Sequence, residues 1–248
     1  MRILKNIFST TLLALVALNG HAQPGLVASF KKVIVSPYIQ VTFVQGEREG
    51  VTINDMVVDS SKLHVEVEDG TLRLYLEGAK EVPHNQHVYN NEYGQQSNHP
   101  YPNHAVVATV TYKTLEELSL RGEETHICSS PLNAAEFSLK IYGASNVIFT
   151  EAHLGQLHTT MYGAGTFGIN TGAVDEQYYT CYGEGKINTM AITGRTGKLT
   201  AYGEAEFNLN VTDRIKIIAF GEARVRYKGN PEIVKGLHFG ALDVKRIE

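Results

Sequence analysis

The sequence predicts an all-β chain folded as a parallel β-solenoid, or β-helix, whose turns are about 20 residues long. Three observations support this prediction. A short phrase of an aromatic residue, a glycine and a small or acidic residue recurs at a near-constant interval, apolar and polar residues alternate around it, and the composition is rich in Gly and Tyr but poor in Pro. Such a composition favours many short strands joined by tight turns.

The recurring phrase marks one position in each turn. Its glycines are separated by 21, 20, 20, 20, 18 and 19 residues: Gly122, Gly143, Gly163, Gly183, Gly203, Gly221 and Gly240. Repeats built from pairs of helices need roughly 33 residues or more, and the spaced leucines of a leucine-rich repeat are missing. One turn of a parallel β-solenoid fits the interval.

Alternation defines a strand on each side of that glycine. Four residues after six of the seven glycines the chain has an apolar residue: Val147, Phe167, Ile187, Phe207, Val225 and Val244. One residue earlier it has only polar residues: Asn146, Thr166, Lys186, Glu206, Arg224 and Asp243. Because alternation of period two indicates a strand with one buried face, each turn is expected to contain a strand, a glycine corner and a second strand.

The two cysteines are expected to be unpaired. Cys128 lies six residues after its glycine and Cys181 lies two residues before its own. They therefore occupy different positions about two and a half turns apart, or roughly 12 Å along the axis. A disulfide needs Cα atoms within about 7 Å of each other. Cys181 is expected to face the core, because apolar residues recur at its position.

Residues 1–22 have the pattern of a secretory signal peptide. Arg2 and Lys5 precede an apolar run from Ile7 to Leu18, and Gly20-His21-Ala22 supplies the small residues of a cleavage site. The alternative is a buried N-terminal helix. The run is too short to span a membrane, and no later apolar run could do so as a helix. The chain is therefore expected to be exported to the periplasm, the cell surface or the extracellular space, with no transmembrane segment.

The rest of the chain divides into an irregular part and a regular part. Residues 23–112 lack the phrase but keep alternating segments, with Asp69-Gly70 as a tight turn between two of them. They are expected to form less regular initial turns of the same solenoid, the alternative being a small separate β-sandwich. Residues 113–248 are expected to form the regular repeats.

A polar segment over residues 78–104 interrupts the irregular part. It is rich in Asn, Gln, His and Pro, and a loop of this length is either functional or disordered. His84 and His87 could ligate a metal. The alternatives are a solvated loop or a contact loop.

The residue before each glycine is aromatic in six turns. We call this column the aromatic ladder: Tyr142, Tyr162, Tyr182, Tyr202, Phe220 and Phe239. Its position points outward or sits at the corner. A row of rings at strand spacing could stack on the faces of sugars. Alternatively, the ladder could be structural and shield the corner backbone.

The residue after the glycine is acidic in several turns. This acidic column contains Glu184, Glu204 and Glu222, with Glu123 before two alanines. Stacked carboxylates repel one another unless they are solvated or bound to a cation. Glu184 and Glu204 are therefore candidate ligands of Ca²⁺, or a carboxylate pair of a glycosidase. The alternative is a solvated corner.

Several segments together resemble one protein family. These are the export signal, the opening FKKVIV, the strand pair DGTLRLYL, the segment LEELSLRGEE, the aromatic-glycine phrases and YKGNPEIV near the end. They are similar to the head GIN domain family of auto-transporter adhesins, over roughly Phe30 to Glu248. The resemblance implies a right-handed parallel β-helix and an adhesin-like function, and it brings no catalytic residues. The chain differs in its aromatic residues before the glycines, and no translocating barrel is expected from its sequence.

These observations favour an exported, non-catalytic binding or adhesion module whose partner is a glycan or a cell-envelope protein. The alternatives are a structural or assembly protein that presents its solenoid surface, and a polysaccharide-active enzyme on a β-helix. The net charge of −4 indicates neither nucleic acid nor an anionic membrane as a partner. No cofactor is expected, since no phosphate loop, zinc-protease helix or Gly-x-Ser-x-Gly motif occurs. Oligomerisation is compatible with the sequence.

Overall fold

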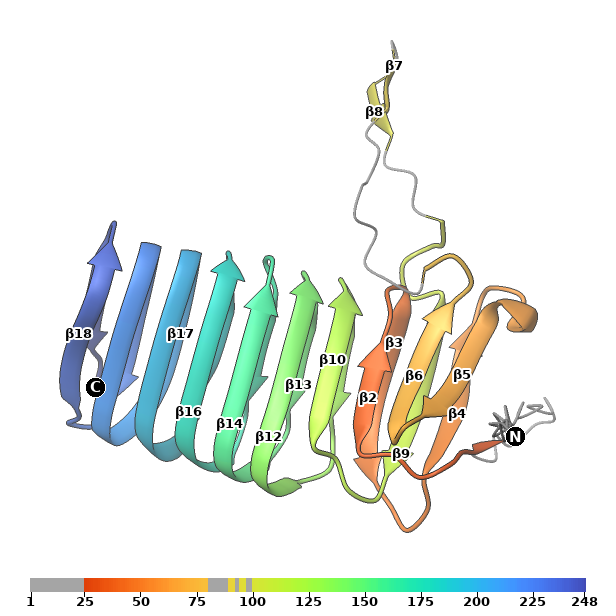
Figure 1. Cartoon of the computed structure of the whole chain (residues 1–248), viewed down its shortest axis with the longest axis horizontal. Coiled ribbons are helices and arrows are strands. Elements are labelled where there is room, and N and C mark those ends of the chain that lie inside the picture. Colours follow the sequence, from red (N-terminus) through yellow and green to blue (C-terminus); the bar gives the residue numbers. More distant parts are fainter. Residues whose placement is uncertain (1–24, 80–88, 92–93, 97–99) are drawn as a thin grey trace, which may run out of the picture.

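The structure, a computed structural model, describes residues 25–79, 89–91, 94–96 and 100–248. The chain winds into a parallel β-solenoid whose turns stack side by side along one long axis (Figure 1). The predicted fold class is confirmed. The predicted signal peptide, residues 1–22, lies outside the described residues.

Two strand-built faces run the length of the solenoid. On the first face, neighbouring strands pair in parallel in this order: β6 (Thr71–Leu76), β2 (Lys32–Val35), β10 (Glu117–Gly122), β12 (Leu132–Gly143), β14 (Ala152–Tyr162), β16 (Gly172–Gly183), β17 (Lys186–Lys228) and β18 (Glu232–Phe239). On the second face the order is β9 (Val106–Tyr112), β3 (Ile39–Gln45), β11 (Thr125–Cys128), β13 (Asn146–Phe149), β15 (Thr166–Ile169), β17 again, and β19 (Leu242–Arg246). β17 continues around the corners and contributes to both faces.

Residues that lie 20 positions apart in the sequence pair with each other on neighbouring strands. Met161 pairs with Cys181 and Tyr162 with Tyr182, so the columns of the sequence are ladders in space. Side chains two residues before the first six glycines are at most 1% exposed: Leu120, Ile141, Met161, Cys181, Ala201 and Ala219. At the last glycine the corresponding residue, His238, is exposed. The core is therefore one continuous stack of inward ladders, as the alternation predicted.

Both cysteines are free and buried. Burial raises the pKa of the Cys128 thiol to about 11 and that of the Cys181 thiol to about 12. The predicted inward position of Cys181 is confirmed.

We expect neither thiol to react in the folded chain, because thiolates are the reactive form and both groups are enclosed. Alkylation without reductant should leave the native mass unchanged and add two labels in denaturant. A chain that takes up no label in denaturant would contradict the register, because it would mean that the two thiols are bonded to each other.

The N-terminal end is built differently from the repeats. β2 and β3 precede β6 and β9 in the chain, but they lie between those two strands and the strands β10 and β11 of the first regular turn. Antiparallel strands cover the outside of β6 and β9: β5 (Leu63–Glu68) pairs with β6, β4 (Gly50–Met56) with β9, and β1 (Gly25–Leu26) with β4. These strands belong to the same sheet as the repeats.

The turn and the short helix at this end follow from local sequence. Asp69 and Gly70 join β5 to β6 with positive φ angles of 48° and 70°, the geometry of a two-residue hairpin turn. The short 3₁₀ helix η1 (Ser60–Lys62) begins where the Asp59 side chain accepts a hydrogen bond from the Ser61 amide at 2.9 Å.

Most of the polar segment predicted over residues 78–104, including His84 and His87, lies outside the described residues. Two short strands within it, β7 (Tyr89–Asn91) and β8 (Gly94–Gln96), pair antiparallel. At its base Tyr101 packs edge-on against Tyr38, with ring centroids 5.8 Å apart, and donates a hydrogen bond to the Glu77 carbonyl at 2.7 Å. No helix in the described part of the chain is long and apolar enough to cross a membrane.

Candidate binding face

The glycine corners set the direction of the side chains beside them. Each corner glycine has a positive φ, between 103° and 129°. Residues that carry a Cβ rarely adopt such a φ. Corners of successive turns are also joined through the backbone: the Ala144 amide donates to the Gly122 carbonyl at 2.9 Å, and Ala164 to Gly143 at 3.0 Å. The residues before and after each glycine are therefore held in register from turn to turn.

The aromatic ladder is a continuous stack of rings. From Tyr142 to Phe220, successive ring centroids lie 4.8–5.2 Å apart and the planes are within 7° of parallel. The last step, from Phe220 to Phe239, is 5.8 Å and 27°. At the other end the Arg121 guanidinium lies 5.5 Å from the centroid of the Tyr142 ring, close enough for a cation–π contact.

The ladder points outward, and it is the ring edges that face solvent. Tyr162, Tyr182 and Tyr202 are 40%, 39% and 41% exposed. Because each of these rings is covered on both faces by its neighbours, the exposed part is the ring edge with its hydroxyl group. A sugar can therefore contact these rings through edges and hydroxyls, whereas stacking on a ring face would require the ladder to open.

The acidic column lies on the other side of the corner. Glu184, Glu204 and Glu222 are all exposed, one in each of three successive turns. In the part of the chain that the structure describes, no three His, Cys, Asp or Glu side chains are grouped as metal ligands. The proposed metal-binding role of Glu184 and Glu204 stays a prediction.

Further along the first face from the ladder, polar columns continue. His158 and Tyr178 stack with centroids 4.5 Å apart and planes 5° from parallel, and Thr160 pairs with Thr180 and Thr180 with Thr200. The first face therefore presents aromatic edges, hydroxyls and an imidazole in parallel rows.

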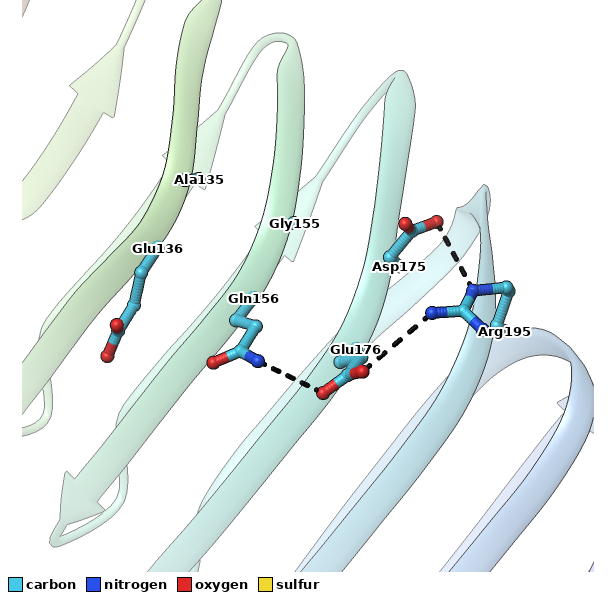
Figure 2. Close-up of a pocket in the computed structure, with 7 residues that line it drawn as sticks. All are labelled: Ala135, Glu136, Gly155, Gln156, Asp175, Glu176 and Arg195. Carbon is cyan, nitrogen blue, oxygen red and sulfur yellow. Dashed lines mark hydrogen bonds and ion pairs between the residues drawn. The ribbon is translucent and has the colours of Figure 1, made fainter.

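A shallow hollow lies on the side of these rows away from the ladder (Figure 2). Its lining residues are Ala135, Glu136, Gly155, Gln156, Asp175, Glu176 and Arg195. Ala135 and Gly155 leave space because they carry little or no side chain. Periodicity could have located this hollow, since Glu136, Gln156 and Glu176 are 20 residues apart, but this column is not among the predicted site residues.

Most polar groups of the hollow are paired with one another, whereas Glu136 lies 3.6 Å from His158 outside it. Glu176 accepts hydrogen bonds from Gln156 at 3.3 Å and from the Tyr178 hydroxyl at 2.6 Å. Arg195 lies 3.8 Å from both Asp175 and Glu176. Glu136 and Glu176 lie two strands apart, or about 9.6 Å at strand spacing, which is wider than the roughly 5–5.5 Å of a retaining glycosidase pair.

Comparison with known proteins decides the family. The chain matches the family model described as "Putative auto-transporter adhesin, head GIN domain" over residues 29–231. The chain belongs to this family. No curated protein matches it.

Three solved structures share the fold of this head GIN domain protein. A "putative adhesin" from Bacteroides fragilis aligns with a TM-score of 0.73 and 18% identity, and one from Parabacteroides merdae with 0.61 and 18%. A "putative lipid binding protein" from Parabacteroides distasonis aligns with 0.64 and 19%. Each alignment covers 92% of this chain and 96% of the other. At these identities the likeness concerns the fold.

Proposed function

We propose that this head GIN domain protein is an exported, non-catalytic adhesion module that binds a glycan along the aromatic ladder. The observation that supports this proposal most strongly is the row of exposed tyrosine edges at Tyr162, Tyr182 and Tyr202. Their ring centroids lie 4.8–4.9 Å apart on the stacked strands. Tyrosine suits such a surface, because it combines an apolar ring with a polar hydroxyl. Export rests on the signal pattern of residues 1–22 and on the adhesin family.

The proposed contact uses both sides of the corner. The tyrosine hydroxyls donate and accept hydrogen bonds, and the carboxylates of Glu184 and Glu204 accept them from sugar hydroxyls. Because both columns repeat once per turn, a linear chain of sugars lying along the solenoid axis meets the same groups several times. Repeated weak contacts on one ligand add up to useful affinity.

Burial of the most reactive side chains supports a non-catalytic role. Cys128, Cys181 and His126 are at most 1% exposed, so they cannot reach a substrate. Glu176 of the hollow is paired with Arg195, Gln156 and Tyr178, and Asp175 with Arg195. A binding surface needs no nucleophile or general base, and the ladder side of the first face fits that requirement.

The proposal predicts that the intact chain is retained on a broad glycan array and that Tyr182→Ala combined with Tyr202→Ala abolishes this retention. Thermal unfolding should show that the double variant still folds, because the lost rings are on the surface. Arg195→Ala in the hollow is the matched control and should keep binding.

Other outcomes would reject specific parts of the proposal. An intact chain that binds no glycan on the array would reject the sugar ligand. Loss of binding with Arg195→Ala alone would place the contact in the hollow. Release of shortened glycan on incubation would show that the protein is an enzyme.

A further inference from the structure

Apart from Ala134, the partly buried apolar side chains that pack against the core lie at the two ends of the solenoid in the described part of the chain. Among the described residues, the partly buried hydrophobic side chains that pack on the core include seven at the N-terminal end: Val27, Ile53, Met56, Val58, Leu63, Val65 and Val67. Four more lie at the C-terminal end: Tyr227, Ile233, Leu242 and Val244. Solenoids normally cover both ends of the core with a polar cap. The two ends of this chain differ, because apolar side chains are only half covered there.

More strongly exposed apolar side chains also lie at both ends. Leu26 and Val57 are 62% and 64% exposed at the N-terminal end. Leu237 and Phe239 are 60% and 62% exposed on β18, where a register shift opposite Ile217 and Ala219 displaces the strand. Apart from Ile247 at the chain terminus, the remaining large hydrophobic residues exposed in the described part of the chain are Tyr162, Tyr182 and Tyr202 of the ladder.

The end strands also have free edges. Within the described residues, β18 and β19 pair only with β17, and β5 pairs only with β6. β1 covers only the Gly50 and Val51 end of β4. An unpaired strand edge is a template for another strand.

We propose that the C-terminal end of one copy of this chain binds the N-terminal end of a second copy, so that solenoids join head to tail. Strand directions fit this arrangement on both faces. On the first face, β18 runs parallel to the neighbouring strand and β5 runs antiparallel to its neighbour. On the second face, β19 runs parallel to its neighbour and β4 runs antiparallel to its own. Stacking two copies in one orientation therefore creates two antiparallel pairs, which are slightly more stable per residue than parallel ones.

The charges of the two ends are opposite. Residues 46–70, which contain β4 and β5, have seven Asp and Glu against two Lys and Arg. Residues 214–248, which contain the last two turns, have eight Lys and Arg against four Asp and Glu. Opposite charges attract the two ends, and like charges disfavour a tail-to-tail contact between two basic ends.

The arrangement of apolar and charged side chains at each end resembles that of a protein interface. At the C-terminal end, Lys235, His238 and Arg246 are exposed beside the half-covered Ile233, Leu242 and Val244. At the N-terminal end, Asp55, Glu66 and Glu68 are exposed beside half-covered valines and leucine. An apolar centre with a charged rim is the usual anatomy of an interface. Because the two patches differ, the contact is heterologous and can extend into a row of copies.

Sedimentation of the full chain over a range of concentrations tests this proposal. The mass-average size should rise with concentration at low salt and fall again when salt is added, because salt screens exposed charges. A chain that stays monomeric at low salt over the whole range would overturn the proposal.

Charge reversal at either end tests the head-to-tail geometry. One variant combines Asp55→Lys with Glu68→Lys, and the other combines Lys235→Glu with Arg246→Glu. Each alone should associate at least about tenfold more weakly than the parent chain, since the two substitutions nearly cancel the net charge of the altered end and place a like charge opposite the unchanged end. An equimolar mixture should associate again, because each variant keeps one end that fits the other.

The same variants separate the alternatives. If the variant altered at its N-terminal end still associates alone, the contact is tail to tail and the proposal is wrong. If the mixture does not associate although both variants show the thermal unfolding of the parent, the two ends do not face each other.

Discussion

Replacing Gly183 by alanine is expected to lower the free energy of unfolding by about 3 kcal/mol or more. Gly183 has a φ of 115°, which a residue with a side chain adopts only with strain. An added Cβ would lie 2.8 Å from the Gly163 carbonyl oxygen and 3.3 Å from the Gly163 carbonyl carbon and Cα. Those atoms belong to the corner of the neighbouring turn and cannot move without breaking the stack.

Gly168→Ala is the matched control for this prediction. Gly168 lies within strand β15, and the nearest atom to its added Cβ, the Asn188 carbonyl oxygen, is 3.5 Å away, an ordinary contact. Alanine there is expected to change stability by no more than about 1 kcal/mol. Urea unfolding measures both variants. Equal losses would show that the corner does not need a glycine.

Replacing His126 by leucine is expected to stabilise the chain, and most strongly in acid. His126 is fully buried in β11, where the equivalent residue of the next turn is Val147, and neither of its ring nitrogens has a partner. Burial lowers its pKa to about 3. An unpaired buried polar group costs about 1–3 kcal/mol even when neutral, so part of the gain is present at pH 7.

The sign of the pH dependence follows from the lowered pKa. Below about pH 6.5 the unfolded chain binds a proton at His126, whereas the folded chain does so only near pH 3. The parent chain therefore loses stability as pH falls through this window, and the leucine variant lacks this loss. The stability difference should grow by about 1.4 kcal/mol per pH unit between roughly pH 6 and pH 4.

Urea unfolding at several pH values measures this difference. His238→Leu is the control for replacing a histidine by leucine, because His238 is exposed on β18. A His126→Leu variant whose advantage does not grow in acid would show that His126 is hydrated or protonated in the folded chain.

Much of the fold could be predicted from periodicity alone. A parallel stack places residues one period apart beside each other, so the column of Cys181 could be assigned to the core and that of Lys186 to solvent. The antiparallel strands β4 and β5 could not be assigned in this way. Alternation shows which side of a strand is buried, but it contains no information on the direction or identity of the neighbouring strand.

The aromatic ladder shows a similar limit to what the sequence can predict. Its position beside the corner could be predicted, but the prediction that its rings offer their faces to sugars overlooked the strand spacing. Rings about 4.8 Å apart on neighbouring strands stack on each other, so Tyr162 and Tyr182 have only their edges to offer. The polar column of the hollow, Glu136, Gln156 and Glu176, could have been found from its 20-residue period, but hydrophobic periodicity does not show the space left beside it at Ala135 and Gly155.

The central claim is that the exposed edges and hydroxyls of the ladder bind a glycan. Titration calorimetry with the best array ligand tests it most directly, comparing the parent chain with the variant in which Tyr162, Tyr182 and Tyr202 are all phenylalanine. Phenylalanine keeps the ring stack and removes only the hydroxyls. We predict that the affinity falls by at least about tenfold, since each lost hydrogen bond is worth about 0.5–1.5 kcal/mol. Unchanged affinity in the folded variant would contradict the claim.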